Sequence, residues 1–405
     1  MSLIDVTVEL GLDSGGGATK FILDSDSMGV LGVDQLGGLV FNDVTQYVKG
    51  VSTTRGRSRQ LDYYNAGVAT VSFDNRSREF DPVNEDSSLY PGVEPRGLLR
   101  ITSAGNPVFY GYVNDWDLEY DLVENDVATA FASDAFSILS NQLLSAFTPS
   151  AQLTGARVNT VLSRSEVAFV GGRDIDAGLS TLGAYAVTAN TNVLNYLRQV
   201  ERSEPGNLYI SRSGDIEFRD RSNIPPDDLL LFADDGTGVN YQSLFNEYGD
   251  ELLYNYIRLK SPAGAEQVKS DTTSINRYQI SQLAYDDLLN SSTVQVAEIA
   301  TLFLSKFKNP QIRFTGLQVE LVGLSDADVQ SILSLELADY VQVKKSFSSG
   351  TPASLTQTLI VSGISHSIKP DSHIVRFNFD GIGGAIFLVL GSTKFGMLDE
   401  GILDF

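Results

Sequence analysis

The sequence DYYNAGVATVSFDN, residues 62–75, alternates between two sets of side chains. One set is Ala66, Val68, Thr70 and Ser72, and the other is Gly67, Ala69, Val71 and Phe73. A period of two is that of a β-strand with two different faces. Two shorter apolar segments, 98–102 and 108–113, follow and are separated by the turn sequence AGNP at 104–107. Short strands joined by turns predict a β-barrel or sandwich that ends near residue 125.

The period changes after residue 125. Apolar residues recur every three or four positions over 127–146, which predicts an amphipathic helix. We expect further helices at 156–163 and after a cap at Asn190 or Thr191, and a hairpin of Leu208–Ile210 with Ile216–Phe218. Residues 126–238 therefore read as an α+β middle domain.

Strands return beyond the sequence IPPDD at 224–228. We expect them at 253–259, 277–280, 312–320, 340–343, 355–364 and 373–379, with a helix at 296–307 between them and a short helix capped by Ser325. Residues 239–384 are thus a second β domain with an inserted helix. The fold class expected is a β-rich, multidomain α+β protein in which two barrel or sandwich domains flank an α+β segment.

Composition excludes several classes of function. The 405 residues contain no cysteine, so disulfides, thiolate zinc sites and cysteine nucleophiles are absent. The net charge of −22 disfavours electrostatic binding to nucleic acid and to anionic membranes. We see no signal peptide, and the apolar run Ala385–Leu390 is far shorter than the ~20 residues of a spanning helix, so we expect no stable membrane insertion.

Candidate chemical sites are incomplete. A calcium-like loop starting at Asp24 has Met28 and Gln35 where two ligands belong. The two histidines, His366 and His373, are spaced to approach one another, but a hydrogen-bonded structural role is more common than a metal site. The glycines at 381–384 are not followed by a phosphate-binding helix. We expect no catalytic residue, no cofactor and no metal, although a pair of carboxylates in a groove stays open as a hydrolase site.

Two segments are candidate partner interfaces. Arg55, Arg57 and Arg59 alternate in an acidic chain, and on one strand face they would suit an acidic protein partner. Residues 385–405 follow a glycine connector and read as an apolar docking tail, with interface candidates Phe395, Leu398, Ile402 and Phe405. A short similarity between residues 21–31 and 388–398 suggests that both segments dock on similar grooves.

Several short segments, in order along most of the chain, resemble one family. They are VTQYV (44–48), RGRS (55–58), AGVATV (66–71), FDNR (73–76), FDP (80–82), LYP (89–91), PRGLLR (95–100), EPGNLYI (204–210), GDIEFRDR (214–221), LELAD (335–339) and VSGISH (361–366). Together they are similar to minor tail, or tail-hub, proteins of siphophages that infect Gram-positive bacteria. These are structural patterns without catalytic content.

The resemblance implies a hub protein at the tail tip of a virion, made in the host cytoplasm. It implies two tube-like β-barrels per chain, so that a homotrimer forms a pseudo-sixfold ring that continues the tail tube. Its partners would be the tail tube or distal tail protein, the tape-measure protein and a tail fibre or receptor-binding protein. Genomic DNA would pass through an acidic lumen without specific binding. The alternatives are a hexameric distal tail protein, and a tail-associated cell-wall hydrolase or carbohydrate-binding module.

Overall fold

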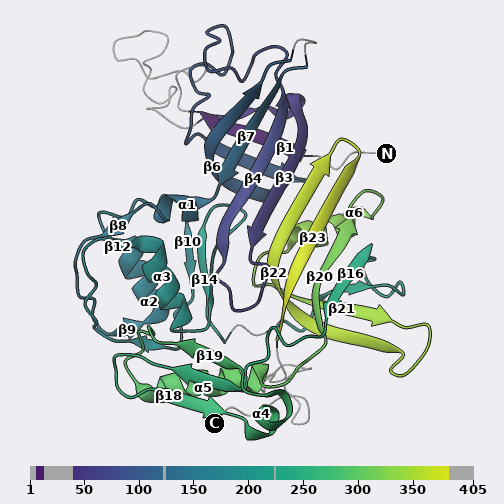
Figure 1. Ribbon diagram of the computed structural model, residues 1–405. Helices are drawn as coiled ribbons and strands as arrows, with labels where there is room; N and C mark the ends of the chain where they lie inside the picture. Colours follow the sequence, from purple (N-terminus) through teal and green to yellow (C-terminus); the bar gives the residue numbers. More distant parts are fainter. Residues whose placement is uncertain (1–5, 13–39, 122–124, 223–224, 383–405) are drawn as a thin grey trace.

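The computed structural model describes residues 6–12, 40–121, 125–222 and 225–382. One sheet of 13 strands runs through the molecule and joins two β units that lie far apart in the sequence (Figure 1). Among the described residues, no helix is long and apolar enough to cross a membrane. The calcium-like loop, the segments 21–31 and 388–398, and Phe395, Leu398, Ile402 and Phe405 lie outside the described residues.

The N-terminal β unit has the strand order β3-β4-β7-β6-β5-β1-β2. Its strands are β1 (Val6–Leu12), β2 (Val40–Asp43), β3 (Val48–Gly56), β4 (Asn65–Asp74), β5 (Leu98–Ser103), β6 (Asn106–Glu119) and β7 (Val127–Ser133), with the 3-10 helix η1 (Thr45–Tyr47) between β2 and β3. The alternation read from residues 62–75 is that of β4, where Ala69, Val71 and Phe73 point into the core. Phe73 stacks on Phe80 there, so an aromatic cluster closes this core.

The C-terminal β unit follows the order β16-β20-β23-β22, and β21 and β15 extend it from β22. Its strands are β15 (Leu230–Ala233), β16 (Ser243–Glu247), β20 (Arg313–Glu320), β21 (Tyr340–Ser346), β22 (Ser354–Lys369) and β23 (Ser372–Gly381). The helix α6 (Asp326–Ser334) lies between β20 and β21 and is capped by Ser325, whose hydroxyl accepts from the Asp328 N–H. Phe377 and Phe232 pack together in its core.

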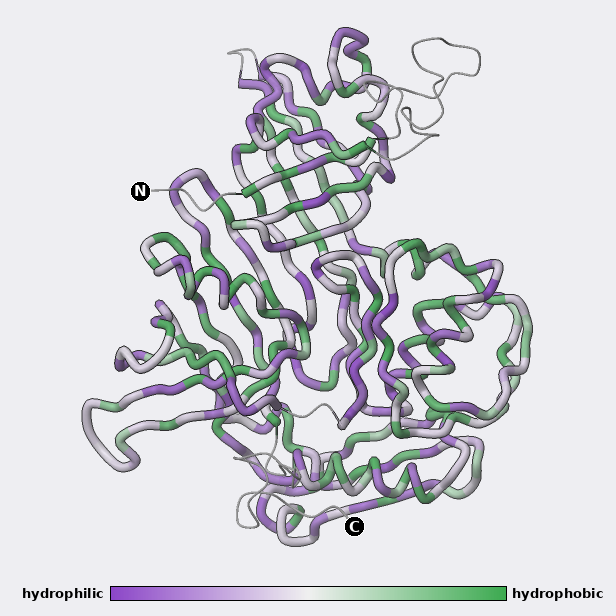
Figure 2. Tube along the Cα trace, turned by 180° about the vertical axis from the view of Figure 1, so that it is seen from behind, coloured by the Kyte–Doolittle hydropathy of each residue, from purple (hydrophilic) through white to green (hydrophobic). Residues whose placement is uncertain are grey.

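The middle segment packs beside this sheet (Figures 1 and 2) and shares one hydrophobic core with the C-terminal β unit. It contains α1 (Ala135–Leu139), β8 (Leu143–Leu144), β9 (Gln152–Leu153), α2 (Thr154–Leu162), β10 (Arg173–Ile175), β11 (Thr181–Leu182), β12 (Thr191–Asn192), α3 (Val193–Arg202), β13 (Asn207–Ile210) and β14 (Ile216–Arg219). The expected α2 and the β13–β14 hairpin are confirmed, and α3 is capped by Asn192 in place of Asn190 or Thr191.

A separate small unit lies at the opposite end from the N-terminal β unit. It contains β17 (Tyr256–Leu259), β18 (Gln267–Ser270), α4 (Thr272–Tyr278), β19 (Gln282–Tyr285) and α5 (Thr293–Phe307). The apolar face of α5, with Val296, Ile299 and Phe303, covers β17 and closes a core of its own. The helix expected at 296–307 is therefore confirmed.

Two expected elements are wrong. Residues 127–133 form β7, because Ala128, Ala130 and Ala132 alternate into the N-terminal core, and only α1 remains of the helix expected over 127–146. The strand expected at 277–280 is instead the end of α4, which the Asp271 side chain caps by accepting from the Ser274 N–H. In the first case packing into the N-terminal core decided the structure, and in the second the Asp271 cap did. Each outweighed a sequence pattern of only a few residues.

Candidate functional site

The two β units are joined by an antiparallel pairing of β3 with β22. Six residue pairs form this joint, from Gly363 opposite Gly56 to Ile368 opposite Val51. Gly56 has a φ of +100°, and a Cβ on it would lie 2.3 Å from the Ser362 carbonyl oxygen. Only glycine allows this close approach of two backbones. The joint makes one continuous sheet out of strands from the two ends of the chain.

Arg55 is buried beside the joint and ties it to other parts of the chain. Its Nη1 donates to Glu336 Oε1 at 2.7 Å and lies 3.4 Å from the Ile210 carbonyl oxygen. The other oxygen of Glu336 accepts from the Arg212 N–H at 2.9 Å. One carboxylate therefore connects β3 to the β13–β14 hairpin through charge-assisted hydrogen bonds.

Arg57 makes a second buried ion pair at the end of the joint. Its Nη2 lies 2.6 Å from Asp380 Oδ2, and its guanidinium stacks over the Tyr64 ring with 4.5 Å to the centroid. Burial alone would lower the pKa of Arg57, but the Asp380 carboxylate raises it above its ordinary value. Burial also raises the pKa of the Tyr64 hydroxyl. Arg57 is therefore a permanent cation, and its ion pair with Asp380 fixes the C-terminal end of β23.

The three arginines do not share a strand face, because β3 ends at Gly56. Arg55 and Arg57 are directed to carboxylates within the chain. Arg59 is exposed and donates to the Glu251 carbonyl oxygen at 2.7 Å. The expectation of one arginine-lined strand face is therefore wrong. Of the three, Arg59 is the one with an exposed side chain.

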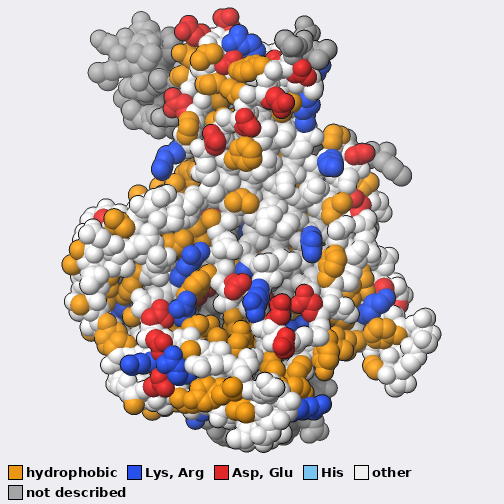
Figure 3. All heavy atoms as spheres, in the orientation of Figure 1, with side chains coloured by type: hydrophobic (Ala, Val, Ile, Leu, Met, Phe, Trp, Pro, Cys, Tyr) orange, Lys and Arg blue, Asp and Glu red, His pale blue; other side chains and the backbone are white. Residues whose placement is uncertain are grey.

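The outward face of the joined sheet carries mostly hydroxyl groups. Residues that lie directly opposite one another on neighbouring strands share a face of the sheet. On this face the opposite residues are Ser52 with Thr70 and Ser367, Thr54 with Val68 and Ser365, Ser72 with Thr129, and Thr70 with Phe131. We call these nine residues the hydroxyl face. Val68 and Phe131 are its apolar members, 48% and 41% exposed. In Figure 3 the middle of the molecule, where β3, β4 and β22 run, is largely white, without a row of charges.

Several strand edges of this sheet are open in the part of the chain that the structure describes. At one end β16 pairs with β20 alone, and β2 at the other end pairs with β1 alone. Within the N-terminal β unit, β6 leaves β5 after Tyr112, so Asp115–Glu119 pair with β7 on one side only. Asp115, Asp117 and Glu119 are exposed there. Unpaired strand edges are templates for pairing with another chain.

The two histidines meet at the joint. His366 Nδ1 lies 3.0 Å from His373 Nε2, and Ser103 of the N-terminal β unit lies 3.5 Å from His373 Nδ1. Both rings are buried. Burial, followed by the charge of His373, lowers the pKa of His366 well below its ordinary value, and burial lowers that of His373 to about 4. The expected hydrogen-bonded structural pair is confirmed. Within the described residues, no group of three or more possible ligands is placed to hold a metal ion.

Neither the joint nor the hydroxyl face was predicted from the sequence. The signal was present, because Ser or Thr occurs at alternate positions in Ser52/Thr54, Thr70/Ser72 and Ser365/Ser367. A strand with a hydroxyl face and an apolar face is ordinary by itself. Only the pairing of β3 with β22 turns three such strands into one surface.

Comparisons with known proteins give the fold. No family model and no curated protein matches the sequence. Among solved structures, the 43 kDa tail protein of prophage MuSo2 from Shewanella oneidensis has a TM-score of 0.57 at 11% identity, over 94% of this chain and 97% of that one. A tail protein from Neisseria meningitidis MC58 has a TM-score of 0.57 at 10% identity, over 94% and 98%.

Prophage tail protein gp18 from Listeria monocytogenes EGD-e has a TM-score of 0.50 at 9% identity, over 84% of this chain and 92% of that one. The expected β-rich fold is confirmed, and the chain has the fold of phage tail proteins.

Proposed function

We propose that the chain is a structural hub protein at the tail tip, or baseplate, of a tailed phage. There it forms a ring that continues the tail tube, connects the tube to host-adhesion proteins and lets DNA pass. The observation that carries this proposal is the β3–β22 joint, which makes one sheet from two β units. The outward face of that sheet carries mostly hydroxyl groups on β3, β4 and β22, between Arg376 on β23 and the carboxylates of Asp115 and Asp117 on β6. Likeness to phage tail proteins over 94% of the chain supports it.

Ring closure follows from the open edges. The path β16-β20-β23-β22-β3-β4-β7-β6 begins at β16, whose outer edge has no partner among the described strands, and reaches β6, which pairs with β5 up to Tyr112 and leaves Asp115–Glu119 open on that side. Pairing β16 of one copy with the outer half of β6 of the next would be a head-to-tail contact, and such contacts close into rings when the rotation allows. Three copies would place six β units around the axis, which suits a sixfold tube.

The hydroxyl face suits the lumen of such a ring. DNA is held by Lys and Arg that neutralise phosphates, and the nine residues of this face carry no charge. Hydroxyl groups exchange hydrogen bonds with water at little cost, so a duplex would slide past them. The expected acidic lumen is replaced in this proposal by one lined mainly by hydroxyl groups, with the carboxylates of Asp115 and Asp117 near the contact between copies and Arg376 opposite Ser365.

The other assignments stay proposals. The partners are the tail tube or distal tail protein, the tape-measure protein and a tail fibre or receptor-binding protein. Arg59 and the docking tail 385–405 are their candidate contacts. The division near residues 125, 238 and 384 also stays a proposal, although β7 pairs within the N-terminal β unit and β15 within the C-terminal one. We propose a non-enzymatic role in the virion, without cofactor or metal, after synthesis in the host cytoplasm.

Cysteine crosslinking tests the ring, because the chain has no native cysteine. A variant with Ser243→Cys on β16 and Asp117→Cys on β6 should give a covalent species of three chains on oxidation. Ser243→Cys alone, the matched control, should stay monomeric, because a head-to-tail contact places no second cysteine opposite it. A ladder ending at six chains would favour the distal tail ring, and a monomeric product would contradict head-to-tail edge pairing.

A further inference from the structure

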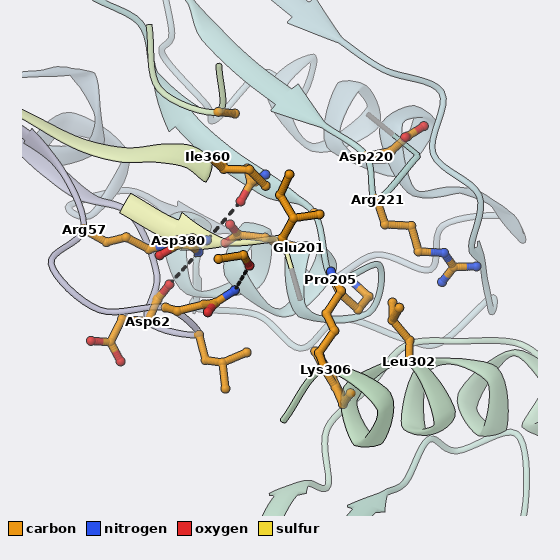
Figure 4. A pocket seen from close by; sticks show the side chains of 18 of the residues that line it. Arg57, Asp62, Glu201, Pro205, Asp220, Arg221, Leu302, Lys306, Ile360 and Asp380 are labelled. Carbon is orange, nitrogen blue, oxygen red and sulfur yellow. Dashed lines mark hydrogen bonds and ion pairs between the residues drawn. The ribbon is translucent and has the colours of Figure 1, made fainter. Parts of the chain in front are cut away.

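A cavity of about 180 Å³ lies where segments from many parts of the chain meet (Figure 4). The loop after β3, the end of α3, the segment after β14, helix α5 and the end of β23 line it. Its apolar wall includes Leu302, Phe303, Tyr285 and Ile360. An engineered cavity of about 150 Å³ with such a lining binds benzene. This cavity can therefore hold one large apolar side chain.

The three arginines that line the cavity each lie near a carboxylate of the chain. Arg57 pairs with Asp380, and Arg202 lies 3.0 Å from Asp287. Arg221 lies 4.0 Å from Glu204. These pairs leave little net charge to attract an ion.

Lys306 is the cation of this lining for which the described residues offer no ion pair. It extends from α5 into the cavity, and its ammonium has no hydrogen-bond partner among the described residues either (Figure 4). Arg221 also leaves Nη1 without a hydrogen-bond partner, although it lies near Glu204. Burial lowers the pKa of Lys306, an effect that Asp380 opposes without cancelling. An acceptor placed in the cavity would remove the cost of an unpaired buried donor.

Glu201 offers the complementary group. One carboxylate oxygen accepts from the Leu208 N–H at 2.9 Å, and its second oxygen has no hydrogen-bond donor among the described residues. Burial raises the pKa of Glu201 to about 7. The cavity thus provides one free donor and one free acceptor next to an apolar wall.

We propose that this cavity binds an uncharged apolar peptide segment of a partner protein. A peptide group has one C=O that accepts and one N–H that donates, which matches Lys306 and Glu201. The neighbouring aliphatic or aromatic side chain of the partner fills the space beside Leu302 and Phe303. A neutral segment fits because the surrounding ion pairs are balanced. The inference concerns the single chain and holds whether or not it assembles into a ring.

Saturation-transfer NMR on the full chain, with N-acetyl-L-leucine N-methylamide as probe, tests the proposal. We expect saturable binding with a dissociation constant on the order of 1 mM for so small a ligand. Lys306→Met keeps the length of the side chain and should weaken binding about tenfold. Leu302→Trp fills the cavity and should abolish binding. Thr301→Trp, on the exposed side of the same helix, is the matched control and should bind as the wild type does.

Three results would overturn the proposal. The first is the absence of saturable binding, or equal binding by the Lys306→Met variant with an unchanged circular dichroism spectrum. The second is tighter binding of N-acetyl-L-leucine, whose free carboxylate would make the cavity an anion site. The third is binding that appears only after Phe387→Ser and Leu388→Ser, which would mean that the chain's own residues occupy the cavity.

Discussion

Acidification should weaken the fold through the histidine pair. In the folded chain the pKa of His373 is about 4, whereas an unfolded histidine titrates near its ordinary value of 6.5. The unfolded state therefore binds more protons between these two values, and the stability contributed by the neutral pair is lost as pH falls below 6.5. His366, which is also shifted downward, acts in the same direction.

The magnitude follows from the shift. One pKa unit corresponds to about 1.4 kcal/mol, so the full contribution of His373 is about 3 kcal/mol, of which about 2 kcal/mol is lost at pH 5. Arg55 and Arg212 also lower the pKa of His366, while Glu320 raises that of His373. Replacing both rings by neutral amides, His366→Asn with His373→Gln, removes the titration and leaves the surrounding charges in place.

Urea unfolding followed by circular dichroism measures the effect. The wild type should exceed the double variant in free energy of unfolding at pH 7.5, and this excess should shrink by at least about 2 kcal/mol at pH 5.0. Carboxylates elsewhere titrate in both proteins and cancel in the difference. Lys369→Gln, an exposed change on the same strand, should show no such pH dependence. An excess that is equal at the two pH values would refute the reasoning.

Four further predictions concern the joint and its surfaces. Glu336→Gln leaves Arg55 buried without its charge partner and should lower the free energy of unfolding by about 3–5 kcal/mol in urea titrations; a loss below 1 kcal/mol would mean that the pair is dispensable. Gly56→Ala should lower the free energy of unfolding by more than the ~1 kcal/mol typical of a left-handed position with open space around it, because its Cβ would meet the opposite backbone. Thermal melting should show this as a lower melting temperature. Ser52→Arg with Ser367→Arg should slow DNA ejection from assembled tails, more so at low salt, and unchanged ejection kinetics would argue against a lumenal hydroxyl face. Deleting the residues after Gly391 should leave a folded protein that fails to join tails, and a drop of several degrees in melting temperature would show that those residues belong to the core.

The sequence predicted elements well where one strong local signal acted alone. The alternation through β4, the apolar stripe of α5 and the Ser325 cap are of this kind, because each needs only neighbouring residues. The signal failed in β7, where small alanines fit either period and the core of the N-terminal β unit decides the outcome.

The site was harder to foresee because its parts are distant in the chain. Arg55 and Glu336 are 281 positions apart, and β3 meets β22 only in the folded molecule. The alternation of side chains predicts which of them share one face of a strand. It does not predict which strand lies next to it, because the topology of the whole fold decides that. For the same reason the three arginines looked like one surface, although the bend at Gly56 sends them to different partners.

The copy number and symmetry of the chain in an intact tail test the central claim most directly. Electron cryomicroscopy of assembled tails should show three copies around the axis, each contributing two β units to a ring whose inner wall carries the hydroxyl face. Six copies with one β unit each in the ring, or an inner wall made by another surface of the chain, would contradict the account.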